Sequence, residues 1–190
     1  MNSLRYLILI VLAMACFLNT LAQKEAKMAS NLTQVVSRFC ECIAKKDSLE
    51  FNYLFFDDNV PFVGVMSEKS ERSIQKDYPD FQGIAVSDSK KFIREISQSD
   101  KAQFEEVYNL EFFAEEKIAS ISFVYVFYSD QKVFQWGHEK WNLVRIEDDW
   151  LINNVIYSIH LPEVEPIPND NLIQLATPDS CIKKKSLGTN

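Results

Sequence analysis

The feature that most constrains the fold is a change in hydrophobic spacing near residue 103. Before it, apolar side chains recur at three- and four-residue steps, which is typical of amphipathic helices. After it, apolar and polar side chains alternate as far as residue 160, which indicates strands with distinct faces. Helices first and a meander of strands afterwards predict an α+β domain with an antiparallel sheet.

Three helices are predicted in the first half of the chain. The first carries one apolar stripe, with Ser30 or Asn31 as its cap, and the third is capped by Asp88. The second ends at the turn residues Asp57 and Asp58, which we interpret as helix-stopping residues. The expected ranges are 30–45, 49–56 and 89–96.

Four strands are predicted in the second half, over 103–112, 121–127, 132–146 and 150–160. On the first, Phe104, Glu106 and Tyr108 are expected to share a face with Leu110 and Phe112. Aromatic residues occur on both faces of the last three strands. Because large bare apolar patches are rare on monomers, we expect the face away from the helices to be covered by a second subunit or by the C-terminal tail.

The first 22 residues predict a secretory signal peptide. Arg5 precedes an unbroken apolar run of 12 residues, Leu7–Leu18, and Ala22 ends the segment. A membrane-spanning helix needs about 20 apolar residues, so the run is too short to be one. We therefore expect cleavage after Ala22 and a protein exported to the periplasm or secreted. The alternative is a lipoprotein anchored at Cys16.

Charge argues against two classes of partner. Removal of residues 1–22 takes away one of 20 basic and none of 27 acidic residues, which changes the net charge from −7 to −8. Nucleic-acid binding depends on Lys and Arg contacts to phosphate, and anionic membranes attract basic segments. No nucleic acid, and no membrane after signal cleavage, is therefore expected as a partner.

Scarcity of Gly and His limits the chemistry. With four Gly, the chain has no phosphate-binding loop or dinucleotide fingerprint, and two His without an HExxH string do not form a His-rich metal centre. We predict no cofactor and no metal. If there is catalysis, carboxylate and tyrosine chemistry is the most plausible kind.

A linker and a tail are predicted on either side of a single domain. Residues 23–28 are a linker, residues 29–162 the domain and residues 163–190 a tail, with four of the six prolines between 162 and 178. Three cysteines remain after cleavage, so at least one thiol is unpaired. Cys40 and Cys42 are expected on different faces of their helix, one in the core and the other able to meet Cys181.

One set of residues recurs in order along the last three strands: Tyr125, Gly137, Glu139, Trp141, Leu143, Val144, Arg145, Trp150 and Ile152. This set resembles the closing strands of the nuclear transport factor 2-like superfamily, which includes SnoaL-like and ketosteroid-isomerase-like proteins. The segment 61–67 (PFVGVMS) and the helix after Asp88 fit the same order, so the resemblance covers residues 30–162. It implies three N-terminal helices packed on the concave side of a strongly bent antiparallel sheet, a cone-shaped fold that commonly dimerises. Asp57 and Asp58 also resemble an acidic pair that some superfamily enzymes place near the pocket mouth, but we keep their interpretation as helix-stopping residues.

Fold does not determine function in this superfamily, which mixes enzymes with binding domains. Alternation places Gly137, Glu139 and Trp141 on one face of their strand and His138 on the other. Burial on an apolar concave face should raise the pKa of Glu139, which suits a general base. The alternative is an ion pair with Lys or Arg on a neighbouring strand. Gly137 would allow the sheet to bend or another element to approach.

Tyr125 is the candidate oxyanion donor, and a core tyrosine with a backbone partner is the alternative. His160 is expected at the surface or an interface. The predicted ligand-binding residues are Tyr53, Phe62, Tyr125, Glu139 and Trp141.

Three functions fit these residues. The favoured one is an exported domain that binds a small apolar ligand or a protein in a helix-covered pocket, as a homodimer through the sheet face. The second is an isomerase, cyclase or dehydratase with Glu139 as base and Tyr125 as oxyanion donor. The third is an interaction domain with a filled interior. We favour binding over catalysis.

Overall fold

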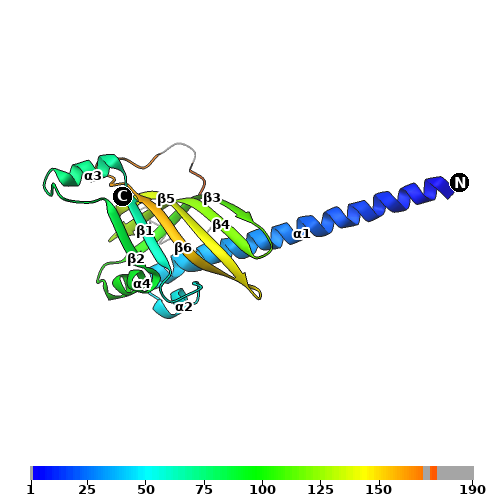
Figure 1. Ribbon diagram of the computed structural model, residues 1–190, viewed down its shortest axis with the longest axis horizontal. Coiled ribbons are helices and arrows are strands. Elements are labelled where there is room, and N and C mark those ends of the chain that lie inside the picture. Colours follow the sequence, from blue (N-terminus) through cyan, green and yellow to red (C-terminus); the bar gives the residue numbers. More distant parts are fainter. Residues whose placement is uncertain (1, 169–171, 175–190) are drawn as a thin grey trace, which may run out of the picture.

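A computed structural model describes residues 2–168 and 172–174; of residues 2–13 and 21 it describes the backbone alone. The domain is a curled sheet with helices packed in its concave side (Figure 1). The sheet has six strands in the order β2-β1-β6-β5-β4-β3 and does not close into a barrel. The predicted α+β class and bent-sheet architecture are confirmed.

The first helix, α1 (Asn2–Lys45), is much longer than the sequence predicts. It runs without a break through Ser30, so the predicted start and cap there are wrong. Residues 22–29 contain no Gly or Pro and several strong helix formers, so nothing local ends the helix. Its N-terminal half projects away from the sheet (Figure 1), and Met28 is the first residue that packs against the core. Among the described residues, no helix is both long and apolar enough to cross a membrane.

Three short helices follow. Asp47 caps α2 (Ser48–Asn52) by accepting from the Glu50 backbone N–H, and the helix ends earlier than predicted. The helix α3 (Glu68–Gln75) was not predicted from the sequence. The helix α4 (Ser89–Gln98) begins at its predicted cap, Asp88, which accepts from the Lys91 backbone N–H at 2.7 Å.

The meander matches the predicted strands and turns. It consists of β3 (Gln103–Ala114), β4 (Ile118–Ser129), β5 (Lys132–Ile146) and β6 (Asp149–Ile159), each antiparallel to the next. Asp130 and Gln131 both have positive φ, the geometry of a two-residue hairpin turn whose twist matches the strands.

Two further strands extend the sheet beyond β6. They are β1 (Pro61–Met66) and β2 (Ile84–Asp88), neither of which was assigned from the sequence. The pair β1–β6 is parallel, which differs from the all-antiparallel expectation. A parallel neighbour needs a long connection, and here almost the whole domain, from β1 to β6, provides it.

Aromatic residues fill the region between α1, α2, α4 and the sheet. Phe39 of α1 lies at its centre, with ring centroids 5.1 Å from Phe51 and 4.7 Å from Trp141. Both Cys40 and Cys42 are buried, so the prediction that they face different environments is wrong. The helix is buried over a wide face because it lies between the sheet and the short helices. Cys181 lies outside the described residues.

A bulge in β3 changes which side chains face inward. Glu105 and Val107 are buried on the concave side, the register shifts between Tyr108 and Glu111, and Leu110 then packs against the core. The prediction of one continuous face from Phe104 to Phe112 is therefore wrong, since a bulge reverses the alternation of side chains.

The C-terminal segment covers part of the convex face. This is one of the two coverings expected from the sequence, the other being a second subunit. Ile167 and Leu172 pack against a small cluster on the sheet that includes Val126 and Trp136. At the bulge, the Asn109 backbone N–H donates to the Ile173 carbonyl at 2.8 Å.

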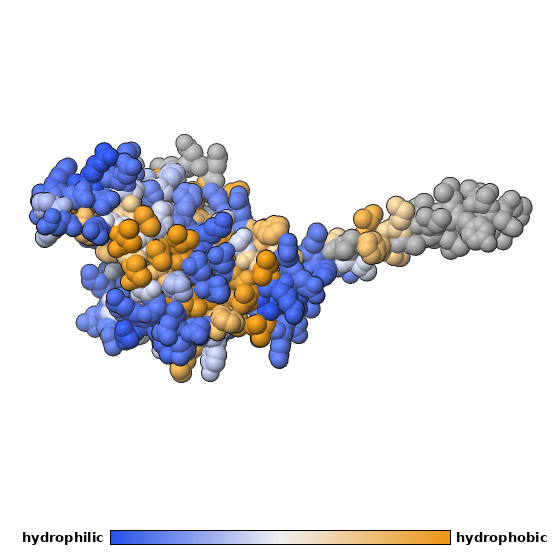
Figure 2. All heavy atoms as spheres, in the orientation of Figure 1, coloured by the Kyte–Doolittle hydropathy of each residue, from blue (hydrophilic) through white to orange (hydrophobic). Residues whose placement is uncertain are grey.

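Another part of this face remains apolar and exposed. Figure 2 shows hydrophobic side chains gathered over the strands β1, β2 and β6. Its exposed members are Val65, Ile84, Val86 and Ile156, which we call the β1–β2–β6 patch.

Candidate functional site

A cavity of about 280 Å³ lies between the concave face of the sheet and the helices. Phe39 of α1 and Phe92 of α4 form its helical wall, and Phe62 of β1 belongs to the sheet wall. The exposed side chains of Glu95 and Phe134 lie at its rim. The interior is therefore not completely packed, which leaves room for a small molecule.

Glu139 of β5 contributes to the cavity lining, as the alternation of its strand predicts. The residue is 6% exposed, and its Oε1 accepts a hydrogen bond from Trp141 Nε1 at 2.5 Å. Burial raises the pKa of Glu139 to about 7, although the indole hydrogen bond acts in the opposite direction. Among the described residues it has no ion pair with Lys or Arg, so the expected raised pKa is found and the ion-pair alternative is not.

A second carboxyl group, Glu105 of β3, lines the same cavity and was missed in the sequence. It is 4% exposed, and burial raises its pKa well above the ordinary value, with the charge of Glu139 as a further cause. Its Oε1 is buried without a hydrogen-bond partner among the described residues. The signal in the sequence was that Glu105 and Val107 lie two apart and so share a face of the strand. The prediction considered only the opposite face, which carries Phe104 and Glu106.

Two carboxyl groups in one apolar cavity do not ionise together easily. Glu139 has the indole donor, which favours its charged form, whereas the Glu105 Oε1 has no donor among the described residues. Near neutral pH, Glu105 is therefore the protonated member and Glu139 the one that ionises first. Such a separation of two pKa values makes one carboxyl an acid and the other a base.

Tyr125 of β4 lines the cavity, but its hydroxyl proton is already used. The hydroxyl donates to the Ser158 carbonyl oxygen at 2.9 Å and accepts from Gln135 Nε2 at 3.2 Å. Burial raises its pKa well above the ordinary value for tyrosine. The structure thus matches the alternative of a core tyrosine with a backbone partner, and the predicted oxyanion donor would have to break that bond.

Of the remaining predicted ligand-binding residues, one lines the cavity and two do not. Phe62 lines the cavity, whereas Trp141 is completely buried and does not line it. Trp141 contacts two lining residues, Phe39 and Glu139, from behind. Tyr53 is 72% exposed just after α2, so the prediction that it lines the cavity is wrong. It directly precedes the buried residues Leu54 and Phe55, and its own ring points outward.

Gly137 allows a close approach of β6, as the sequence suggested. A Cβ atom at this position would lie 2.0 Å from the Ser158 carbonyl oxygen, the same oxygen that accepts from Tyr125. The absence of a side chain therefore positions one wall of the cavity.

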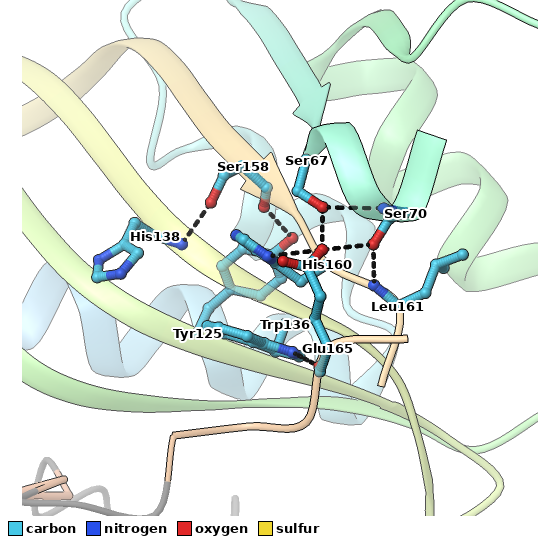
Figure 3. Close-up of polar contacts among 9 residues, drawn as sticks. All are labelled: Ser67, Ser70, Tyr125, Trp136, His138, Ser158, His160, Leu161 and Glu165. Carbon is cyan, nitrogen blue, oxygen red and sulfur yellow. Dashed lines mark hydrogen bonds and ion pairs between the residues drawn. The ribbon is translucent and has the colours of Figure 1, made fainter. Parts of the chain in front are cut away.

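The two histidines do not take part in the cavity. His138 is exposed on the opposite face from Glu139, as predicted. His160 stacks on Trp136 with ring centroids 4.2 Å apart, and its Nδ1 lies 3.4 Å from Glu165 Oε2. Figure 3 shows His160 beside Trp136 and Glu165, and none of these three residues lines the cavity.

Glu165 attaches the C-terminal segment to the start of α3. Its carboxylate accepts from the hydroxyls of Ser67 and Ser70, and its backbone carbonyl accepts from Trp136 Nε1 at 2.7 Å (Figure 3). The Ser67 hydrogen bond is the main reason that its pKa is lowered. This arrangement explains how the segment is held on the sheet.

Asp57 and Asp58 also lie outside the cavity. Asp57 accepts from the Asn59 backbone N–H at 3.1 Å and Asp58 pairs with Lys90 at 2.5 Å, so both lie in a turn, as predicted. The predicted role as helix-stopping residues is wrong, because α2 already ends at Asn52. Among the described residues, no three His, Cys, Asp or Glu side chains are arranged to hold a metal ion.

Comparison with known proteins identifies the fold. No protein-family model and no curated protein matches the sequence. Several solved structures resemble it, among them a nuclear transport factor 2-like protein with a cystatin-like fold from Novosphingobium aromaticivorans. That structure has a TM-score of 0.54 at 9% identity, over 74% of this chain and 86% of the other.

Two similar structures carry provisional dehydratase names. A provisional scytalone dehydratase from Novosphingobium aromaticivorans has a TM-score of 0.54 at 13% identity, over 74% of this chain and 89% of the other. A provisional dehydratase from Streptomyces avermitilis has a TM-score of 0.52 at 12% identity, over 72% of this chain and 99% of the other. At these identities the likeness establishes the nuclear transport factor 2-like fold and leaves activity to the residues of the cavity.

Proposed function

We propose that this domain binds a small, largely apolar molecule in its cavity, with the polar group of that molecule at Glu105 and Glu139. The observation that carries the proposal is the buried, unpartnered Glu105 Oε1 in the cavity lining. Buried polar atoms are normally paired, and an unpaired one costs about 1–3 kcal/mol. A ligand with an N–H or O–H group would provide the missing partner.

The rest of the lining supports an apolar ligand body. Aromatic rings from α1, α4, β1 and β4 surround the space, alongside six side chains with carboxyl, amide or aliphatic hydroxyl groups. Small-molecule sites generally combine an apolar wall with a small number of polar anchors. The cavity volume of about 280 Å³ suits a compact molecule such as a substituted benzene.

A neutral probe tests the proposal. We expect 2-phenylethanol to give saturation-transfer NMR signals with the wild-type protein and perturb the Glu105 and Glu139 carboxyl resonances. Ser99 lines the cavity, so Ser99→Trp should abolish binding, whereas Gln98→Trp, on the exposed neighbouring position, should not. Binding that survives Ser99→Trp would refute the proposal, and so would a wild type that binds neither this alcohol nor the corresponding amine, 2-phenylethylamine.

A second candidate, proton-transfer catalysis, is favoured by the opposed protonation states of Glu105 and Glu139. Glu139 would remove a proton from a carbon next to a carbonyl, while protonated Glu105, in place of Tyr125, would donate to the oxygen. The dehydratase names of two similar folds agree with this class of chemistry.

Deuterium exchange into 4-phenyl-2-butanone tests the catalytic candidate. The protein should accelerate exchange next to the carbonyl, with a rate that rises with pH through about 7 as Glu139 ionises. Glu139→Gln should remove the acceleration. Equal rates with both proteins would exclude this mechanism and leave binding alone.

We also propose export and self-association. Expression in a secreting bacterium should give a processed chain beginning at Gln23, and a lipid-modified chain beginning at Cys16 would support the alternative. For the homodimer, we assign the contact to the β1–β2–β6 patch, an exposed apolar part of the sheet face. Light scattering should give twice the chain mass, and Val86→Asp should reduce it to one; a monomeric wild type would refute the dimer.

A further inference from the structure

The described residues of the cavity lining include acidic groups but no basic group. Glu95, Glu105 and Glu139 line it, and among the described lining residues there is no Lys, Arg or His. Lys91 lies 3.9 Å from Glu95, but this pair is solvent-exposed and Lys91 does not line the cavity. An anionic ligand would therefore meet carboxyl groups without a compensating cation.

Hydrogen-bond acceptors without partners are also concentrated there. Glu105 Oε1 and the side-chain amide oxygen of Gln103 are both buried and unpartnered among the described residues, and both residues line the cavity. The residues are two apart on β3, so their side chains project from the same face. A ligand group that donates several hydrogen bonds would satisfy them together.

Aromatic rings form the remaining walls. They belong to Phe39, Phe62, Phe92, Phe127, Phe134 and Tyr157. The faces of aromatic rings attract organic cations, an interaction that strengthens when the cation leaves water. Carboxyl groups, unpaired acceptors and aromatic rings in one cavity favour a cation with an apolar body.

We infer that the ligand of this cavity is a small organic ammonium compound, with its N–H donors toward Gln103 and Glu105 and its charge beside Glu139. This inference rests on the proposed binding function. An ammonium group provides up to three donors and no acceptor, which matches the unpaired oxygens. A neutral hydroxyl compound has a single donor, so it would pair one acceptor, and it lacks the positive charge that attracts an ionised carboxylate.

The groups around Glu139 predict how affinity depends on pH. Glu105 of β3, Tyr125 of β4, Tyr157 of β6 and Glu95 of α4 line the same cavity. Lys46 donates to the Ser99 carbonyl near it but is not part of the lining. Because the pKa of Glu139 is about 7, its ionised fraction increases about tenfold between pH 6 and pH 8. Affinity for an ammonium ligand should increase by about the same factor.

Three matched probes test the inference: 2-phenylethylamine, 2-phenylethanol and 3-phenylpropanoate, measured by calorimetry and ligand-observed NMR. At pH 8 the amine, which is protonated there, should bind at least tenfold more tightly than the alcohol, and the carboxylate most weakly. The preference for amine over alcohol should fall at least tenfold in Glu139→Gln. It should be unchanged in Glu111→Gln, an exposed position on β3 outside the cavity.

The outcomes separate the two proposals. If the alcohol or the carboxylate binds as tightly as the amine, the ammonium inference is overturned and the binding function stands. If none of the three compounds binds, both are overturned. Should Glu139→Gln fail to fold, the pH series on the wild type decides. A tenfold rise for the amine with a flat response for the alcohol supports the inference, and parallel responses overturn it.

Discussion

Replacement of Glu139 by Gln should change the pH dependence of stability. In the unfolded chain this carboxyl ionises near its ordinary value of 4.5, whereas burial in the folded protein raises its pKa to about 7. Between these values the folded state holds a proton that the unfolded state has released. The stability of the wild type therefore falls as pH rises through this range.

The magnitude follows from the difference between the two pKa values. Each unit corresponds to 1.36 kcal/mol, so this one group lowers the free energy of unfolding by about 2–3 kcal/mol between pH 5 and pH 8. The amide side chain of the variant does not ionise, and its oxygen can still accept from Trp141 Nε1. Relative to wild type, Glu139→Gln should therefore gain about 2–3 kcal/mol over this pH interval.

Urea denaturation at pH 5, 6, 7 and 8 measures the effect. Glu111→Gln, an exposed substitution on β3, is the matched control and should follow the wild-type curve. Comparing differences between pH values cancels any constant cost of the amide group. If the wild type and Glu139→Gln change in parallel from pH 5 to pH 8, the raised pKa and the acid–base assignment are both refuted.

Three other substitutions test the surroundings of the cavity. Gly137→Ala places a Cβ 2.0 Å from the Ser158 carbonyl oxygen, so it should lower the free energy of unfolding by roughly 1–3 kcal/mol in denaturant titrations; an unchanged value would contradict the close approach. Trp141→Phe removes the indole donor, so NMR titration should give Glu139 a pKa above its wild-type value, and an unchanged or lower value would contradict the stabilisation of the charged form by that hydrogen bond. Glu165→Gln weakens the contacts of the C-terminal segment with α3, and limited proteolysis should cleave near residue 165 several-fold faster than in wild type, whereas equal cleavage would assign the attachment to apolar packing.

The sequence predicted best those elements whose side chains follow a regular period. The strands β4–β6 and the helix α4 occupy nearly their predicted positions, because alternation and the Asp88 cap are local signals. Glu139 was recognised for the same reason: it alternates with Gly137 and Trp141 on a regular strand. The short strands β1 and β2 were missed because few residues form them and their pairing depends on β6 and on each other.

Errors occurred where regularity was interrupted or where distant elements meet. The bulge near Asn109 reverses the faces of β3. Asn109 has a positive φ, a backbone conformation in which Asn is enriched, but the bulge was not recognised from this residue in the sequence. As a result Glu105 was assigned to no site. Tyr53 was placed in the pocket on the strength of its aromatic character, yet it lies at the surface after α2.

The sequence by itself determined the α+β class, the meander and the inward orientation of Glu139, since each depends on the spacing of residues along one element. Only the tertiary structure decided that Glu105 shares a cavity with Glu139, that the Tyr125 hydroxyl is bonded to Ser158 and that Trp141 supports Glu139 from behind. These relations join β3, β4, β5 and β6 across the sheet. They depend on register, a bulge and the absence of a side chain at Gly137, none of which hydrophobic periodicity specifies.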